Sequence, residues 1–212
     1  MTWAQRSNKF RLTAMFYEKT WRLNSITKLS GFKFTLEDER KLLLDWMQPQ
    51  PECIYLDLGC STALYARFIA KHEPASINVA VDNSLPMLES ARDRGLEEKV
   101  DMYLLYSDAR KLPFFDNYIH GISCGGTLNE FSNPQEVMHE ARRVIRDDGI
   151  FFIMYLNKAK SIPGRTVQVI SGSSGLTFFN EAESNKLFES TGFKVENRKE
   201  LGVVNFAKLR AV

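Results

Sequence analysis

The spacing of apolar residues before residue 50 is helical. Over residues 8–23 it is four, three and four positions, and the residues are Phe10, Ala14, Tyr17 and Trp21. They therefore share one face of a predicted helix. A second helix is predicted to begin after the N-cap Thr35, with Asp38 three residues on, and to end before Pro49. We expect residues 1–50 to form a helical extension that caps a larger domain over 51–212.

The pattern changes after residue 50 to short apolar runs that alternate with helical stretches. The predicted strands are 54–58, 77–81, 100–105, 118–124, 150–155, 193–201 and 203–211. The predicted helices are 62–72, 85–94, 134–146 and 181–191. Strands this continuously apolar have no solvent-exposed face, which indicates a mostly parallel sheet covered by helices on both sides. The predicted fold class is α/β, doubly wound.

Residues 157–179 interrupt this alternation. The segment NKAKSIPGRTVQVISGSSGLTFF is long for a connection in a compact domain. Long ordered connections are commonly lids or binding loops. We expect this one to lie near a substrate.

Composition narrows the class of protein. The chain is 44% hydrophobic and 25% charged, which is typical of a globular protein. It has no run of about 18 apolar residues and no uninterrupted apolar core near its start. Its three cysteines form no C-x-x-C pair and suggest no metal site. We expect a cytoplasmic protein that acts on a small molecule, with no nucleic-acid partner.

The charge is unevenly distributed. Residues 1–34 hold seven Lys or Arg and one acid, a net +6, whereas the whole chain carries +2. Such a segment suits a solvated helix face, or contact with an anionic lipid surface or an acidic substrate. The sequence leaves these alternatives open.

The candidate chemistry follows the predicted strands, because ligands of doubly wound sheets bind outside the carboxyl ends of the strands. The first strand runs into Asp57 and Gly59, and the second ends at Asp82. A carboxylate in this second position can accept hydrogen bonds from both hydroxyls of a ribose. Asp82 could instead cap the following helix.

Asp108 and Ala109 follow the third strand and extend this site. A carboxylate can accept the amino protons of adenine while the next backbone N–H donates to the ring, and the small Ala109 side chain leaves that backbone reachable. After Gly59 the sequence reads C-S-T-A-L, without the further glycines that a pyrophosphate requires. The pattern therefore favours adenosine without a phosphate, as in S-adenosylmethionine.

These segments resemble a known family. DLGCSTALYARFIA, VDNSLPMLESAR and YSDARKLPFFDNYIHGISCGGTLNEFSNPQEVMHEARRVIRDDGIFFI are similar to class I S-adenosylmethionine-dependent methyltransferases. They look closest to the ubiquinone and menaquinone C-methyltransferase branch, over about residues 53–155 and faintly to 193. FYEKTWR is similar to an uncharacterised cyanobacterial and chloroplast subgroup. The resemblance implies a seven-stranded sheet of order 3-2-1-4-5-7-6, with the seventh strand antiparallel.

The resemblance also implies roles for single residues. Asp57, Gly59 and Cys60 would border the methionine part of the cofactor, and Gly125 would lie near its amino group. Asp82 would hold the ribose. Asn83 would lie beside the adenine, whose edge Asp108 and Ala109 would hold. No metal is implied.

The chain departs from the family at three places. Ser61 and Ala63 stand where glycines are usual, Asp147-Asp148-Gly149 replaces a more basic approach to the fifth strand, and Asn129-Glu130 replaces a histidine pair. Replacing glycine is harmless where φ is negative and costly where it is positive. Ser61 could donate its hydroxyl to the cofactor carboxylate.

The expected reaction is methyl transfer to a small, apolar or ring-containing acceptor, which requires in-line positioning and exclusion of water. Tyr17 and Glu130 are the candidates for a base. The three histidines are placed in a helix end, a strand and a helix interior. The competing hypotheses are a non-catalytic binding protein of the same fold and a nicotinamide-dependent reductase.

Overall fold

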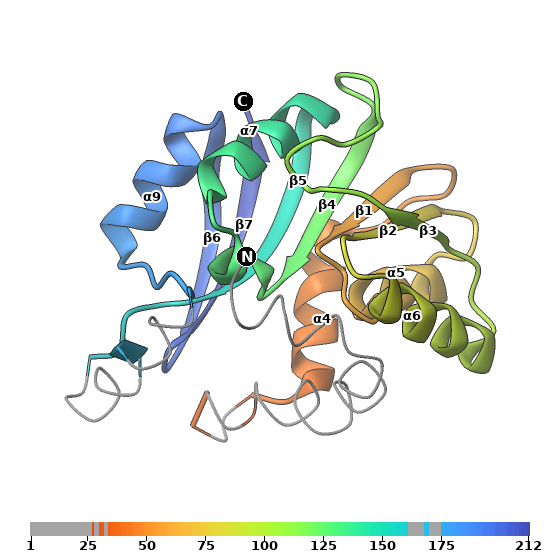
Figure 1. Ribbon diagram of the computed structural model, residues 1–212, viewed down its shortest axis with the longest axis horizontal. Helices are drawn as coiled ribbons and strands as arrows, with labels where there is room; N and C mark the ends of the chain where they lie inside the picture. The colour runs from red at the N-terminus through yellow and green to blue at the C-terminus, as the bar shows by residue number, and fades with distance from the viewer. Residues whose placement is uncertain (1–26, 28–29, 32–33, 161–167, 170–174) are drawn as a thin grey trace.

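The computed structural model describes residues 27, 30–31, 34–160, 168–169 and 175–212 (Figure 1). The helix predicted over 8–23, with Tyr17 on its apolar face, lies outside the described residues. So does almost all of the basic segment. Within the described part of the chain, no helix is long and apolar enough to cross a membrane.

The core is one seven-stranded sheet with the order β3-β2-β1-β4-β5-β7-β6. Its strands are β1 (Ile54–Leu58), β2 (Ile77–Asp82), β3 (Tyr103–Tyr106), β4 (Ile119–Gly125), β5 (Ile145–Leu156), β6 (Phe193–Leu201) and β7 (Val204–Ala211). Neighbours from β3 to β5 pair in parallel, and β7 is antiparallel to both β5 and β6. The predicted fold class and strand order are confirmed.

Several predicted boundaries were wrong, most clearly around the third and fifth strands. The third strand starts at Tyr103, not at residue 100, because the preceding helix continues to Glu98 and the Val100 N–H closes its end on the Gly95 carbonyl at 3.0 Å. The helix predicted over 134–146 ends at Val144, and β5 begins directly at Ile145. Residues 147–149, expected to lead into the strand, are part of it, as are residues 145–146 of the predicted helix.

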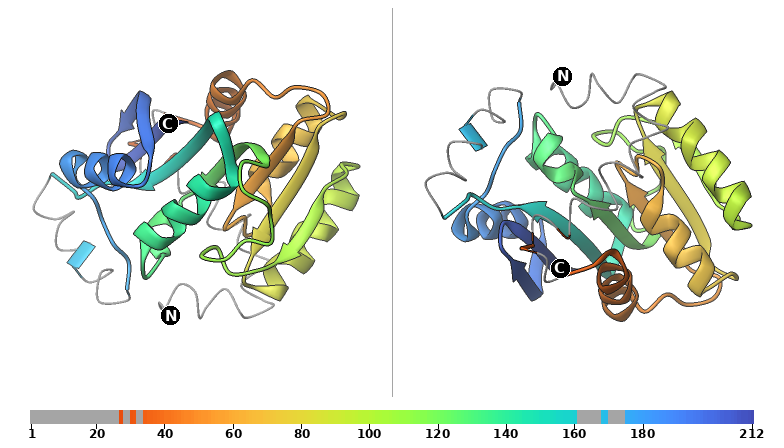
Figure 2. Two further views of the ribbon diagram at one scale, coloured as in Figure 1. Left: turned by 90° about the horizontal axis from the view of Figure 1, so that it is seen from above. Right: turned by 90° about the horizontal axis from the view of Figure 1, so that it is seen from below.

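Helices cover both faces of the sheet (Figure 2). One face carries α4 (Leu36–Met47), α5 (Leu64–His72) and α6 (Leu85–Glu98), and the other carries α7 (Pro134–Val144) and α9 (Glu181–Ser190). Phe152 and Phe206 contribute to the core under α4 and α5, while Phe151 and Phe188 contribute to the core under α7 and α9. This two-sided burial explains why the central strands β1, β2, β4 and β5 carry long apolar runs, whereas the edge strand β6 is largely polar.

Helix α4 begins as predicted. The Thr35 hydroxyl accepts the Asp38 N–H at 3.2 Å, and the Asp38 carboxylate accepts the Thr35 N–H at 2.9 Å, which is a complete capping box. The helix contacts α5 and β5. Its fully buried Glu39 bonds with the Tyr65 hydroxyl of α5. This helix therefore packs as part of the sheet domain.

Buried Asn129 anchors the end of β5. It lies in η2 (Thr127–Glu130), the 3-10 turn after β4. Its amide donates to the carbonyls of Leu156 and Thr177, at 2.9 and 2.6 Å, and accepts the Leu156 N–H at 2.8 Å. One side chain thus joins the tip of β5 to the described end of the predicted 157–179 segment.

Thr35→Ala should lower the free energy of unfolding by about 1 kcal/mol, the usual cost of losing an N-cap. Thr35→Ser retains the hydroxyl and should stay within a few tenths of a kcal/mol of the wild type. Urea unfolding followed by circular dichroism measures both. Equal destabilisation by the two substitutions would contradict the capping role.

Candidate functional site

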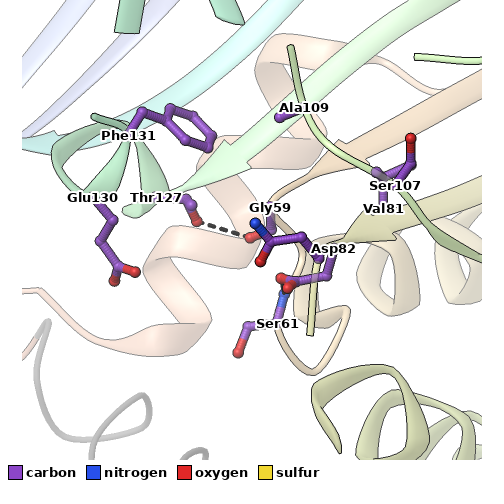
Figure 3. Close-up of a pocket in the computed structure, with 10 residues that line it drawn as sticks. Gly59, Ser61, Val81, Asp82, Ser107, Ala109, Thr127, Glu130 and Phe131 are labelled. Carbon is purple, nitrogen blue, oxygen red and sulfur yellow. Dashed lines mark hydrogen bonds between the residues drawn. The ribbon is translucent and has the colours of Figure 1, made fainter. Parts of the chain in front are cut away.

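Five parallel strands, β1 to β5, end at the same edge of the sheet, where the chain order reverses between β1 and β4. Two small pockets open here and share Gly59 and Ser61, in the loop after β1. The first is completed by Val81, Asp82, Asn83, Ser107, Ala109, Thr127, Glu130 and Phe131 (Figure 3). The second is completed by Asp57, Cys60, Thr62, Leu64, Tyr65 and Gly125. The structure therefore gathers most of the predicted site residues.

The Asp82 carboxylate joins two loops. One oxygen accepts the Ser61 N–H at 2.8 Å and the other accepts the Ser84 N–H at 2.9 Å. Desolvation raises the pKa of Asp82, and its backbone hydrogen bonds act in the opposite direction. Each oxygen has acceptor capacity beyond its one N–H. Asp82 therefore fixes the turn that leads into α6, whose N-cap is Ser84, and does not itself cap the helix; it can still accept the hydroxyls of a ligand.

Gly59 lies where only glycine fits. Its φ is +64°, and a Cβ atom would lie 2.5 Å from the Thr127 Cγ2. The Thr127 hydroxyl also donates to the Gly59 carbonyl at 2.8 Å. This contact fixes the loop after β1 against η2.

Ser61 and Ala63 adopt the conformation that suits glycine. Their φ angles are +52° and +57°. This conformation carries a steric cost for residues with a Cβ. The Ser61 hydroxyl lies 3.3 Å from the Met87 Sδ. The loop thus keeps the glycine-type path, held by the Ser61 N–H bond to Asp82, although the glycines are absent.

The side chain of Asp57, a residue of β1, lies at the N-terminus of α5. Its buried carboxylate accepts the Ala66 N–H at 3.2 Å and the Ser123 hydroxyl at 3.2 Å. In a dinucleotide site a helix N-terminus receives the pyrophosphate. Here a carboxylate of the protein already accepts an N–H of the first turn.

Cys60 and Gly125 line the second pocket together with Asp57. Burial raises the pKa of the Cys60 thiol well above its usual value, so this cysteine is protonated and unreactive near neutral pH. The thiol can contribute to the shape of the pocket but not to nucleophilic chemistry. The free Cys53 thiol, which lines neither pocket, is only partly buried.

Asp108 and Ala109 separate in the structure. Ala109 lines the first pocket, whereas Asp108 lines neither pocket. The Asp108 side chain is 47% exposed and pairs with Arg110 at 2.7 Å, and the hydrogen bonds from Arg110 lower its pKa. The role of Asp108 at an adenine edge remains a prediction, which requires the carboxylate to turn from Arg110.

Glu130 is the predicted base candidate that the structure describes, since Tyr17 is outside the described residues. It lines the first pocket, on the side opposite Ser107 and Ala109 (Figure 3). Burial, and secondarily the negative charge of Asp82, raise its pKa to about 7. The histidines line neither pocket.

Ser107, Thr127 and Phe131 were not among the predicted site residues. Ser107 directly precedes Asp108, while Thr127 and Phe131 belong to the turn after Gly125 and Gly126. Their position just beyond a strand end was the available signal. The Thr127 hydroxyl reaches the loop after β1 at Gly59. This contact depends on the path of the turn, which the strand pattern does not contain.

Ser61→Gly should be more stable than Ser61→Ala by about 1 kcal/mol, because both lose the hydroxyl and only glycine relieves the positive φ. The same pair at Ser90, inside α6, should show the reverse order by a similar amount. Chemical denaturation of the four variants measures both differences. An alanine variant at position 61 as stable as the glycine variant would contradict the left-handed backbone.

Known proteins resemble this chain in both sequence and structure. Residues 56–153 match the family described as "Methyltransferase domain". An uncharacterised chloroplastic methyltransferase of Arabidopsis thaliana is 23% identical, over 94% of this chain and 56% of the relative. A ubiquinone/menaquinone biosynthesis C-methyltransferase of Ruegeria sp. is 28% identical, over 53% of this chain and 46% of the relative. The chain thus spans about half the length of these curated relatives.

Structural similarity agrees with the sequence match. A SAM-dependent methyltransferase from Aquifex aeolicus superposes with a TM-score of 0.70 at 20% identity, covering 92% of this chain and 98% of that one. At this identity the likeness establishes the fold. The chain therefore has the fold of this S-adenosylmethionine-dependent methyltransferase, and residues 56–153 are similar to the methyltransferase domain family.

Proposed function

We propose that this protein is an S-adenosylmethionine-dependent methyltransferase. The observation that carries the proposal is the charge of the two pockets at the switch point. Asp82 and Glu130 line the first and Asp57 the second, whereas no Lys or Arg of the described residues lines either. Such a site repels a pyrophosphate and suits adenosine attached to a cation.

The residues present fit S-adenosylmethionine. Asp82 offers paired acceptors to a ribose, and the backbone beside the small Ala109 is reachable from the pocket. The neighbouring pocket around Gly59 and Gly125 would take the amino-acid part. A dinucleotide fits less well, because the Asp57 carboxylate already accepts the Ala66 N–H at the start of α5.

The protein contributes positioning. When bound, S-adenosylmethionine supplies a methyl group already activated on a sulfonium. Asp82 would fix the ribose, and the loop held by Thr127 and Gly59 would fix the depth of the cofactor in the cleft. Holding the acceptor in line with the methyl group then accounts for most of the catalysis.

The acceptor is proposed to be small and apolar or ring-containing. Phe131 gives the first pocket an aromatic side. The similarity to a quinone-biosynthesis C-methyltransferase supports the same class of acceptor. Glu130 lies at this side and is the described group that could take a proton from a weakly acidic acceptor.

A non-catalytic binding protein of the same fold is the second candidate. It is favoured by the glycine-type φ angles of Ser61 and Ala63, and by Asn129, which is fully used in structural hydrogen bonds. Such a protein keeps the sheet and acts as a binding or scaffold module. Only the methyltransferase requires both cofactor binding and turnover.

Asp82→Ala should weaken S-adenosylmethionine binding at least tenfold, about 1.4 kcal/mol, because it removes the ribose acceptors and releases the Ser61 N–H. Isothermal titration calorimetry with S-adenosylmethionine, S-adenosylhomocysteine and NADH measures it. The matched control is Asp93→Ala, an exposed carboxylate on α6. Unchanged affinity would reduce Asp82 to a helix-capping residue, and heat with NADH alone would favour the reductase.

Purified protein should transfer labelled methyl groups to a component of lipid or pigment extracts. Thin-layer chromatography with radiometric detection identifies the labelled product, and the Asp82→Ala variant should show the label reduced at least tenfold at subsaturating methyl donor. Cofactor binding without any labelled product in such extracts would favour the non-catalytic binding protein.

A further inference from the structure

Glu130 lines the first pocket, but the proposed binding of adenosine gives it no role. The pocket has two ends: Ser107 and Ala109 come from the segment after β3, and Glu130 and Phe131 come from the opposite side (Figure 3). Asp82 reaches the pocket from the tip of β2, next to Asn83. If adenine and ribose occupy the side of Ala109 and Asp82 and the amino-acid part enters the second pocket, the sulfonium between them lies in the first pocket's remaining space, with Glu130 on the wall opposite Ala109.

The ligand changes charge at that point during turnover. In methyl transfer the S–CH₃ bond breaks, its electron pair stays on sulfur, and the sulfonium becomes a neutral thioether. A carboxylate attracts the sulfonium and has no comparable attraction to the thioether, and the difference is large in a desolvated pocket. The pocket walls therefore decide how well substrate and product are distinguished.

We infer that Glu130 is the residue that discriminates the sulfonium of S-adenosylmethionine from the thioether of S-adenosylhomocysteine, and that it does so only when ionised. The inference rests on the proposed function and adds a specificity determinant to the same site. Glu130 acts here through its electrostatic attraction to the sulfonium and forms no covalent bond.

The electrostatic surroundings of Glu130 set the pH at which this discrimination operates. Among the described residues, the Asp82 carboxyl of β2 is the charged group that shifts the pKa of Glu130. Burial, with Glu130 as a minor contributor, raises the pKa of the Cys124 thiol of β4 to about 12, so this thiol stays neutral. Burial and the charge of Asp82 raise the pKa of Glu130 from 4.5 to about 7. Glu130 is therefore mostly protonated below pH 7 and mostly ionised above it.

Binding of the sulfonium and protonation of Glu130 oppose each other. A bound sulfonium favours the ionised form and so lowers the pKa of Glu130, which makes binding release a proton at pH values just below 7. Affinity for S-adenosylmethionine rises with pH through that range. Affinity for S-adenosylhomocysteine has no such contribution from Glu130. Discrimination between the two ligands is thus gained as pH rises and lost as it falls.

The test is calorimetric titration of the full chain with each ligand at pH 6 and pH 8. The ratio of the Kd for S-adenosylmethionine to that for S-adenosylhomocysteine should be up to about tenfold higher at pH 6, since the ionised fraction of a group with pKa about 7 falls by that factor. Glu130→Gln should remove this part of the pH dependence. Glu136→Gln, an exposed position on α7, is the matched control.

Titration of the wild type in two buffers of different ionisation enthalpy gives a second readout that needs no variant. Near pH 6.5, S-adenosylmethionine should release more protons on binding than S-adenosylhomocysteine. Three outcomes would each overturn the inference and leave the proposed function intact. They are a Kd ratio that does not change with pH, equal proton release for both ligands, and a pH dependence that persists in Glu130→Gln. Absence of binding by both ligands would instead overturn the proposed function itself.

Discussion

The site depends on the hydrogen bonds that the Asp82 carboxylate accepts from two backbone N–H groups, those of Ser61 and Ser84. They join the loop after β1 to the turn after β2, so the two halves of the crevice have a fixed spacing. A buried carboxylate needs such partners, because desolvation otherwise disfavours its charged form. The same side chain that organises the loops is thereby held with acceptor capacity facing the pocket.

The strained loop is explained by this constraint. Ser61 and Ala63 have positive φ angles, which residues with a Cβ adopt at a cost. The Asp82 bond to the Ser61 N–H and the close contact between Gly59 and Thr127 leave the chain little alternative path. Local strain of this kind persists where the surrounding structure over-determines the backbone, which is common at ligand sites.

Negative charge gives the crevice its selectivity. Asp57 accepts an N–H of the first turn of α5, where a dinucleotide site would receive a phosphate, and Asp82 and Glu130 face the adjoining pocket. The switch point of a doubly wound sheet commonly accepts nucleotides. In this protein the same geometry, lined by carboxylates, suits the proposed ligand, which carries positive charge near the adenosine.

The sequence by itself determined the architecture and the position of the site. Continuous apolar strands fixed the two-sided sheet, and Thr35 with Asp38 fixed the start of α4, because burial and capping follow local patterns. The orientation of single side chains was decided only by tertiary structure. Asp108 pairs with Arg110 at the surface, Asn129 became structural, and Glu130 acquired a pKa of about 7. These outcomes depend on desolvation and on partners distant in the chain, which periodicity does not contain.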